Sequence, residues 1–182
     1  MTILSLWLPI LVSAVLVFIA SAAVWTALPW HKTDFAKTEK EDSVREALRG
    51  QPPGYYMLPY VMDREAIKQP EFQQKWTDGP NAYITVIPNG MPNMGPKLVQ
   101  SFVYYLGVGV ICAYLVSRTM AADSDYLSVF RIAGTVSFIA YGIAYIQDSI
   151  WFGGPWAITG KNLVDALIYG LITGGVFGWL AV

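Results

Sequence analysis

Residues 4–30 form an apolar stretch without a single charged side chain, and this stretch restricts the chain to few kinds of fold. About 20 apolar residues in a helix cross the roughly 30 Å hydrocarbon layer of a bilayer. Charge is concentrated elsewhere, because 18 of the 25 charged residues lie in residues 31–98. The other 114 residues carry only 7 charges, too few to cover a water-exposed surface. The sequence therefore predicts an integral membrane protein.

Three further apolar stretches follow, and with the first they predict an all-α transmembrane four-helix bundle. They cover residues 98–117, 127–150 and 162–182. The first stretch lacks the basic start and the cleavage site of a secretory signal, so we interpret it as a retained helix. The expected organisation is transmembrane helix one in residues 1–30, an extramembrane insert in residues 31–97, and transmembrane helices two to four in residues 98–182. Four crossings place both termini on one side of the membrane.

The insert is predicted to be a small α+β cap. It contains several aromatic residues, whereas disordered segments are poor in them. A capping-box pattern at residues 38–41 and a stop at Gly50 mark its first helix. The predicted elements are a helix over residues 39–49, a strand over 55–61, a helix over 70–77 and a strand over 83–87. A two-stranded ribbon is marginal in water, so the insert is expected to lean on the bilayer, the bundle or a partner.

Basic residues near the predicted helix ends are concentrated on the insert side. That side carries Lys32, Lys37, Lys40, Arg45, Arg49, Lys97 and Lys161, against Arg118 and Arg131 on the other side. Because loops rich in lysine and arginine stay in the cytoplasm, the sequence predicts a cytoplasmic insert.

Small residues recur at every fourth position of the predicted helices. The candidate helix-packing residues are Gly109, Ala113, Ala140, Ala144, Ala166, Gly170, Gly174 and Gly178. Small residues let two backbones approach closely, which is a main source of helix attraction in a bilayer. The stripes either hold the four helices of this chain together or leave one stripe free to dock another subunit. Val176, about 160° from Gly174 around helix four, is expected to tolerate leucine if that side of the helix faces lipid.

Asp148 and Asp165 are the only carboxylates inside the predicted spans, each about one turn from a helix end on the insert side. They flank one loop, so they can approach each other if helices three and four are neighbours. Asp148 continues the line of Ala140 and Ala144, which would direct it towards a packed interface. A carboxylate in hydrocarbon is costly and is typical of a proton or cation path. The alternative is structural anchoring at the interface, with Lys161 as a partner.

His31 and Asp34 follow the first predicted helix, and further acidic residues come at positions 39, 41 and 42. Imidazole and carboxylate groups can bind a divalent metal ion, but one histidine with irregularly spaced acids is a weak pattern. Acidic residues are also common in the first turn of a solvated helix. We therefore predict no metal site and retain His31 and Asp34 only as weak candidates.

Tryptophans mark the insert-side ends of the predicted spans, among them Trp30, Trp151 and Trp156. Aromatic belts of this kind are common at membrane interfaces. A bound lipid or quinone could lie between such rings, although an interfacial belt explains them equally well. No other cofactor is predicted.

Several segments resemble a widespread family of uncharacterised bacterial four-helix inner-membrane proteins. They are residues 28–35 (LPWHKTDF), 54–59 (GYYMLP), 79–80 (GP), 165–169 (DALIY) and 177–180 (FGWL). The resemblance extends over nearly the whole chain and implies a bacterial inner membrane, but no activity is established for the family. Related chains carry a second histidine near the position of Trp25, and its absence here argues against a shared metal site.

The remaining features exclude several function classes. Cys112 is the single cysteine, which excludes an intramolecular disulfide and argues against a structural zinc site. The net charge of −1 gives no reason to expect nucleic acid, and no catalytic motif is present. We predict a non-catalytic accessory or assembly subunit that packs among membrane lipids on a larger complex or on itself. The alternative is a small transporter or channel that uses Asp148 and Asp165.

Overall fold

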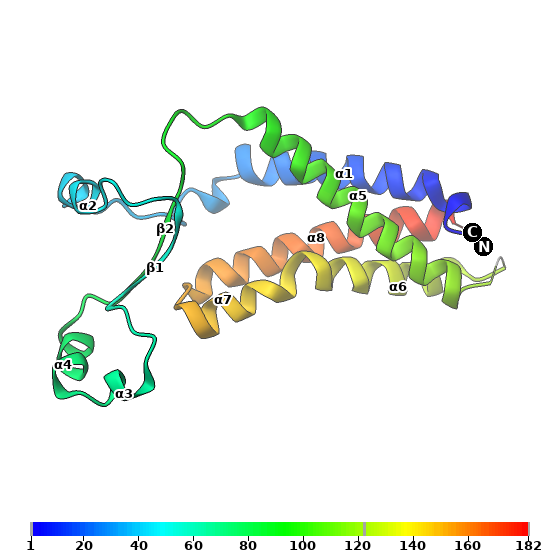
Figure 1. Ribbon diagram of the computed structural model, residues 1–182. Coiled ribbons are helices and arrows are strands. Elements are labelled where there is room, and N and C mark those ends of the chain that lie inside the picture. Colours follow the sequence, from blue (N-terminus) through cyan, green and yellow to red (C-terminus); the bar gives the residue numbers. More distant parts are fainter. Residues whose placement is uncertain (1, 122, 182) are drawn as a thin grey trace. The chain divides into compact units, whose positions relative to one another are not determined.

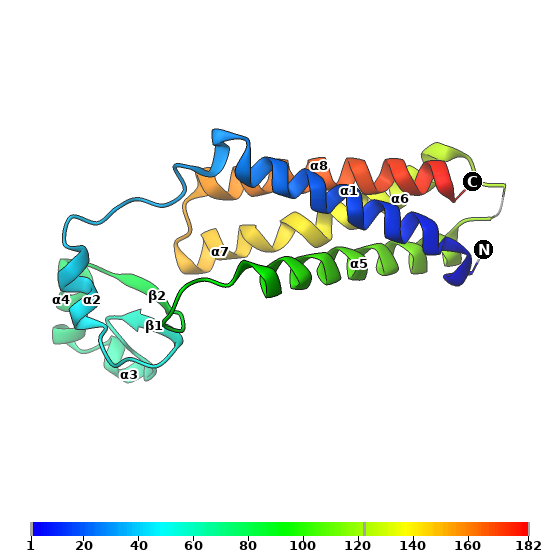
Figure 2. The ribbon, with the colours of Figure 1, turned by 90° about the horizontal axis from the view of Figure 1, so that it is seen from above.

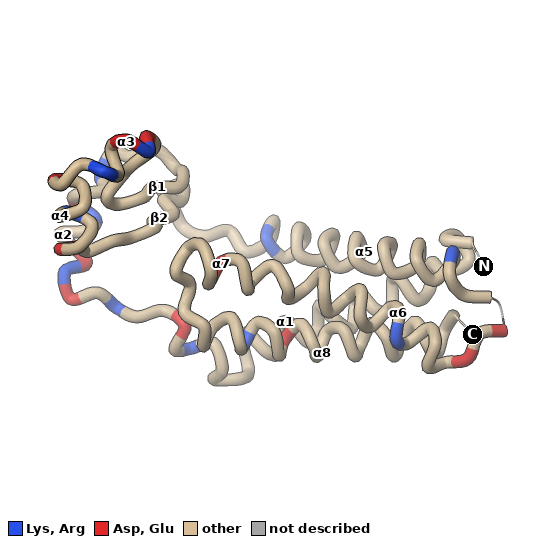
Figure 3. Tube along the Cα trace, turned by 90° about the horizontal axis from the view of Figure 1, so that it is seen from below, with Lys and Arg blue, Asp and Glu red and all other residues tan. Residues whose placement is uncertain are grey.

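The computed structural model describes residues 2–121 and 123–181, and this part of the chain contains four helices long and apolar enough to cross a membrane. They are Leu4–Thr26, Met94–Thr119, Tyr126–Phe152 and Trp156–Leu180. The prediction of four such helices, with a small insert between the first and the second, is confirmed. In Figure 3, long stretches of each of these helices carry neither acidic nor basic residues.

The chain divides into two compact units. The helical unit comprises Met1–Ala36 and Asn93–Val182, and the insert unit comprises Lys37–Pro92. The spans of the helical unit are η1 (Leu4–Leu6) with α1 (Trp7–Thr26), then α5 (Met94–Thr119), then α6 (Tyr126–Phe138) with η3 (Ile139–Ile143) and α7 (Ala144–Phe152), and last α8 (Trp156–Leu180).

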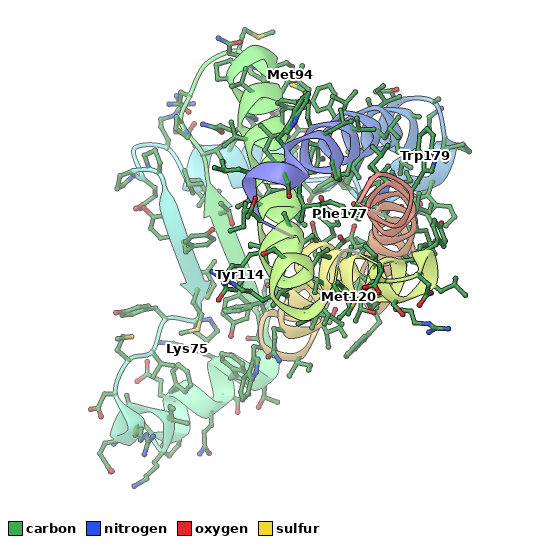
Figure 4. All side chains as sticks on the ribbon, turned by 90° about the vertical axis from the view of Figure 1, so that its right-hand side faces the viewer. Lys75, Met94, Tyr114, Met120, Phe177 and Trp179 are labelled. Atoms are coloured by element: carbon green, nitrogen blue, oxygen red, sulfur yellow. The ribbon has the colours of Figure 1, made fainter. Side chains whose placement is uncertain are left out.

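Within the helical unit, α8 packs along both α6 and α1, while α5 packs against α1 and α6. The beginning of α1 and the end of α8 lie at the same end of the unit (Figures 1 and 2). The core at this end includes Val116, Val129 and Phe177, all fully buried. Seen along the helices in Figure 4, Phe177 lies among the helices, whereas Trp179 lies on the outer side of α8. One turn of α8 thus contains both a core residue and an outward-facing interfacial residue.

A π-helical turn, η3, interrupts the third span. Before this turn, Ala133 and Ser137 are fully buried. After it, Ala144 and Asp148 are exposed. A π turn adds a residue to one helical turn and so rotates the following positions to another face. The expected continuous line from Ala140 through Ala144 to Asp148 therefore does not face the interior of the unit.

Local polar contacts hold the ends of the spans. The Asp125 side chain accepts a hydrogen bond from the Ser128 backbone N–H at 3.1 Å and caps α6. Between α7 and α8, Gly153 takes a left-handed conformation with φ of 69°, which ends α7. Across this turn, the hydroxyl oxygens of Ser149 and Thr159 lie 2.5 Å apart and are buried. These contacts fix the start of α8, which carries the charged residues of the site.

The insert unit has the predicted helices and ribbon, together with one further short helix. Its elements are α2 (Glu41–Ala47), β1 (Gly54–Leu58), α3 (Arg64–Ile67), α4 (Pro70–Asp78) and β2 (Ala82–Val86). The strands are antiparallel, with Tyr56 opposite Ile84. The expected capping box does not form, because α2 begins at Glu41 after Lys40, which makes no side-chain capping bond. Instead, acidic residues occupy the first turn of α2, where the helix dipole favours them.

The boundaries of the insert differ from those expected. Residues 31–36 belong to the helical unit, because His31 and Asp34 bond to side chains of α8. At the other end, α5 begins at Met94, where the Asn93 side chain accepts a hydrogen bond from the Gly95 N–H. Long-range polar contacts at one end and a local cap at the other therefore shorten the insert to residues 37–92.

Candidate functional site

His31, the sole histidine of the sequence, lies just after α1, in the short helix η2 (Pro29–His31). Pro29 occupies the first turn of η2, where its fixed φ suits a helix start. The imidazole ring lies flat against the Trp25 indole, with ring centroids 3.9 Å apart and planes 5° apart. His31 is 7% exposed, so the sequence places its polar ring in a buried position at the end of the first span.

Both ring nitrogens of His31 contact carboxylates. Nδ1 lies 2.5 Å from Oδ2 of Asp34, and Nε2 lies 2.8 Å from Oδ2 of Asp165 in α8. A neutral imidazole has one N–H, so two hydrogen bonds require either an imidazolium or a protonated carboxyl group on one partner. His31, Asp34 and Asp165 together therefore hold one proton more than a neutral imidazole and two ionised carboxylates would hold.

Lys161 completes the cluster one helical turn before Asp165. Its Nζ lies 2.5 Å from Oδ1 of Asp34 and 3.1 Å from the Thr33 hydroxyl oxygen. The hydrogen bond from Lys161, followed by that from His31, lowers the pKa of Asp34 below its usual value of 3.8. With an ionised Lys161, the group of His31, Asp34, Lys161 and Asp165 is electrically neutral in either proton arrangement.

A cavity of about 130 Å³ adjoins this charged cluster. Its lining comprises Trp25, Tyr104, Tyr105, Tyr141, Tyr145, Asn162, Asp165 and Tyr169. Asp165 is 5% exposed and uses Oδ2 for His31. Among the described residues, neither its Oδ1 nor the buried Tyr169 hydroxyl has a hydrogen-bond partner. Unpaired buried oxygens are costly, so this lining has unused capacity for a polar ligand.

Tyrosine rings from α5, η3 and α8 support one another around the cavity. The Tyr141 ring lies 5.7 Å from the Tyr104 and Tyr169 rings and 5.9 Å from the Tyr105 ring, all close to edge-on. The Tyr104 hydroxyl donates to the Ala140 carbonyl at 2.7 Å, and the Tyr105 hydroxyl donates to the Ser21 hydroxyl at 3.1 Å. Because these two hydroxyl protons are engaged, their oxygens are left as acceptors.

The two candidate carboxylates have different positions. Asp165 joins the buried cluster, whereas Asp148 is exposed on α7 and takes no part in it. The sequence could not separate them, since each lies about one turn from a helix end. The difference arises from η3, which rotates Asp148 outward, and from His31, which bonds to Asp165 across the helical unit.

The weak metal candidates, His31 and Asp34, do lie together, but His31 directs both ring nitrogens to carboxylates. Across residues 2–121 and 123–181, no group of three or more histidine, cysteine, aspartate or glutamate side chains is arranged to hold a metal ion. Glu39, Glu41 and Asp42 are exposed and belong to the insert unit.

The small residues of α8 face the third span of the same chain. A Cβ atom on Gly170 would lie 3.0 Å from the Gly134 carbonyl, and one on Gly174 would lie 2.9 Å from the Phe130 carbonyl. On Gly178 it would lie 2.8 Å from the Tyr126 ring. The α8 stripe is thus occupied by α6 inside the chain.

The other packing candidates divide into buried and exposed positions. Ala166 and Ala113 are buried, and a Cβ on Gly109 would lie 3.2 Å from the Ile10 side chain of α1. Ala140 is half-buried, whereas Ala144 is exposed. Val176 is 7% exposed and packs inside the unit, so the condition under which it would tolerate leucine is not met.

Sequence reasoning missed the aromatic part of the site. Neither Trp25 nor the five tyrosines of the cavity are among the site residues predicted from the sequence. One signal was present: Lys161, Asp165 and Tyr169 follow at four-residue spacing, as do Tyr141 and Tyr145. Such spacing places polar groups on one face of an otherwise apolar helix.

Comparison with known proteins gives no relative from which a function could be transferred. No family model, no curated protein and no solved structure matches this chain. The family resemblance stated above therefore stays an expectation, and the functional argument depends on the geometry of the site.

Proposed function

We propose that this protein is a small proton-coupled membrane transporter that carries a solute through the helical unit. The observation that carries this proposal is the burial of Asp165 in a spanning helix, bonded to His31 and beside a tyrosine-lined cavity. Ionisable groups within membrane spans are costly and are typically retained for ion or proton movement.

The arrangement supports both parts of such a cycle. The His31–Asp165 pair holds a proton between a nitrogen and an oxygen 2.8 Å apart, so the proton can be carried by either group. Asp165 and Tyr169 line the same cavity, and each has a buried side-chain oxygen without a hydrogen-bond partner among the described residues, which we assign to solute binding. One carboxylate therefore takes part in proton binding through one oxygen and in solute binding through the other.

Proteoliposomes loaded with a pH-sensitive dye test the proposal. A panel of small cations and neutral solutes is added outside, and the internal pH is compared with that of protein-free vesicles. We expect at least one solute to drive a proton flux that Asp165→Asn abolishes and that Asp148→Asn, at the exposed carboxylate, preserves. A wild-type flux equal to that of empty vesicles for every solute would reject the transporter.

A second candidate function is that of an accessory subunit packing on a membrane complex or on itself. It is favoured by the insert unit, in which no described residue is buried. The large apolar side chains of Tyr55, Met62 and Met91 are 81–93% exposed there and could be covered by a partner. Under this proposal, extraction in mild detergent yields a defined complex, and deletion of residues 37–92 with a short replacement linker releases the partner. A monomer that retains solute-driven proton flux favours the transporter instead.

We further propose that the protein resides in a bacterial inner membrane with its insert in the cytoplasm. The excess of lysine and arginine beside the insert-side helix ends supports this orientation. A cysteine introduced at exposed Tyr55, in a Cys112→Ser background, tests it. Labelling by a membrane-impermeant thiol reagent in intact cells would reverse the orientation, whereas labelling only after lysis supports it.

A further inference from the structure

The cavity beside Asp165 has the chemistry of a cation site. Its lining combines aromatic rings with oxygen acceptors, and the unpaired Oδ1 of Asp165 is the acceptor with the greatest negative charge. Aromatic faces attract cations, and ammonium groups are recognised by several rings together. Lys161 is directed to Asp34 and Thr33 and is not among the residues that line the cavity.

We infer that this cavity binds a small monovalent cation of the ammonium type in exchange for one proton, a ligand assignment that rests on the proposed transporter function. The volume of about 130 Å³ corresponds to about four water molecules at their share of liquid volume. A primary ammonium ion with a short alkyl group fits this space. Asp165 and Tyr169 line this space, and their Oδ1 and hydroxyl oxygen, which have no hydrogen-bond partner among the described residues, are the acceptors that we assign to the ammonium N–H groups.

Charge balance defines the exchange. The cluster of His31, Asp34, Lys161 and Asp165 is neutral with its shared proton, so adding a cation would leave an uncompensated positive charge among apolar helices. Release of one proton to water from the His31–Asp165 pair leaves a neutral imidazole and a carboxylate. The entering cation then restores neutrality, and no covalent bond other than that to the proton changes.

The exchange makes cation binding dependent on pH. The groups around the shared proton are Asp34 and Lys161 from the cluster, with Tyr104, Tyr105, Tyr141, Tyr145 and Tyr169 around the cavity. Lys161 is paired with Asp34. Affinity for the cation is therefore expected to rise with pH as the shared proton becomes easier to release.

Titration calorimetry of the full-length protein in detergent tests the inference, with methylammonium chloride as the probe and sodium chloride as the reference salt. Measurement in two buffers of different ionisation enthalpy counts the protons released. We expect methylammonium to bind more tightly than sodium with release of about one proton, because the cluster must stay neutral. Failure of methylammonium to bind above the sodium reference, or binding without proton release, would overturn it.

Matched variants locate the site. Asp165→Asn is expected to weaken methylammonium binding by about tenfold or more, since a charged acceptor is lost. Asp148→Asn changes an exposed carboxylate and should leave binding unchanged. If Asp165→Asn does not yield folded protein, Tyr169→Phe removes only the unpaired hydroxyl and should weaken binding, whereas Tyr114→Phe, at an exposed ring, should not. Equal affinities for Tyr169→Phe and Tyr114→Phe would place the cation elsewhere.

The binding experiment and the flux experiment test the cation site and the transporter separately. Methylammonium binding with proton release but no flux in proteoliposomes would reject the transporter and retain the cation site. Flux driven by a neutral solute, with no methylammonium binding, would retain the transporter and reject the cation.

Discussion

The Trp25 indole and the His31 imidazole lie in parallel contact, 3.9 Å between centroids, although one residue is in the last turn of α1 and the other in η2. Between them, Leu28 has an extended backbone and Pro29 begins η2. The stack fixes the plane of the imidazole, and this plane determines whether both ring nitrogens reach their carboxylates. Trp25 is therefore a positioning residue for the site.

We predict that Trp25→Ala lowers the stability of the helical unit by about 1 kcal/mol, the scale of a partly exposed stacking contact. Trp25→Phe keeps a ring over His31 and should lose less. The measurement is thermal unfolding in mild detergent, with Trp179→Ala as the control at a 73% exposed tryptophan. Equal melting temperatures for Trp25→Ala and Trp179→Ala would show that the stack contributes nothing.

A double-mutant cycle tests the coupling between His31 and Asp165. His31→Gln leaves the buried Asp165 carboxylate without its partner, a loss that costs about 3–5 kcal/mol for buried pairs. Adding Asp165→Asn removes the stranded charge, so the double variant should be more stable than the sum of single effects predicts. Chemical denaturation in detergent measures the four free energies. Strict additivity would mean that the two side chains do not interact.

Acid is expected to weaken the cluster through Asp34. Lys161 and His31 hold the pKa of the folded-state carboxyl below its usual value of 3.8, so the stabilisation is complete above that value and is lost as the pH falls through the lowered pKa. The melting temperature of the wild type should therefore fall as the pH drops below about 4 and through the lowered pKa. Asp34→Asn should reduce this fall, whereas Asp148→Asn should not. If the melting temperatures of the wild type and Asp34→Asn fell in parallel with pH, the role assigned to Asp34 would be contradicted.

Gly174→Leu is predicted to disrupt the contact between α6 and α8. A Cβ at this position already lies 2.9 Å from the Phe130 carbonyl and 3.0 Å from Gly134 Cα, so a larger side chain must push two backbones apart. Gly107→Leu is the matched control, because Gly107 is in mid-span of α5 with open space around its Cβ position. We expect the Gly174 variant to lose several degrees in melting temperature more than the Gly107 variant. Equal losses would mean that helix propensity alone is responsible.

The location of the spans could be predicted from sequence because it depends on local properties. Residues 4–30 are apolar over a length that suits a bilayer, and no distant contact is needed to draw that conclusion. The insert was predictable for the same reason, since turn residues and short runs of aromatic or β-branched residues mark its elements. Helix ends were less well predicted: α5 begins at Met94, four residues before the expected start, because the Asn93 cap extends it.

The sequence by itself determined four helices long and apolar enough to cross a membrane and a small α+β insert, and it presented Asp148 and Asp165 as equivalent candidates. Only the tertiary structure separated them. A π-helical turn rotated Asp148 outward, and the pairing of His31 with Asp165, 134 residues apart, brought the buried cluster together. Hydrophobic length is summed along a segment, whereas a buried charge is stable only beside partners that folding brings from distant segments. For this reason the spans can be read from the sequence, but the site depends on how α1, α5, η3 and α8 pack.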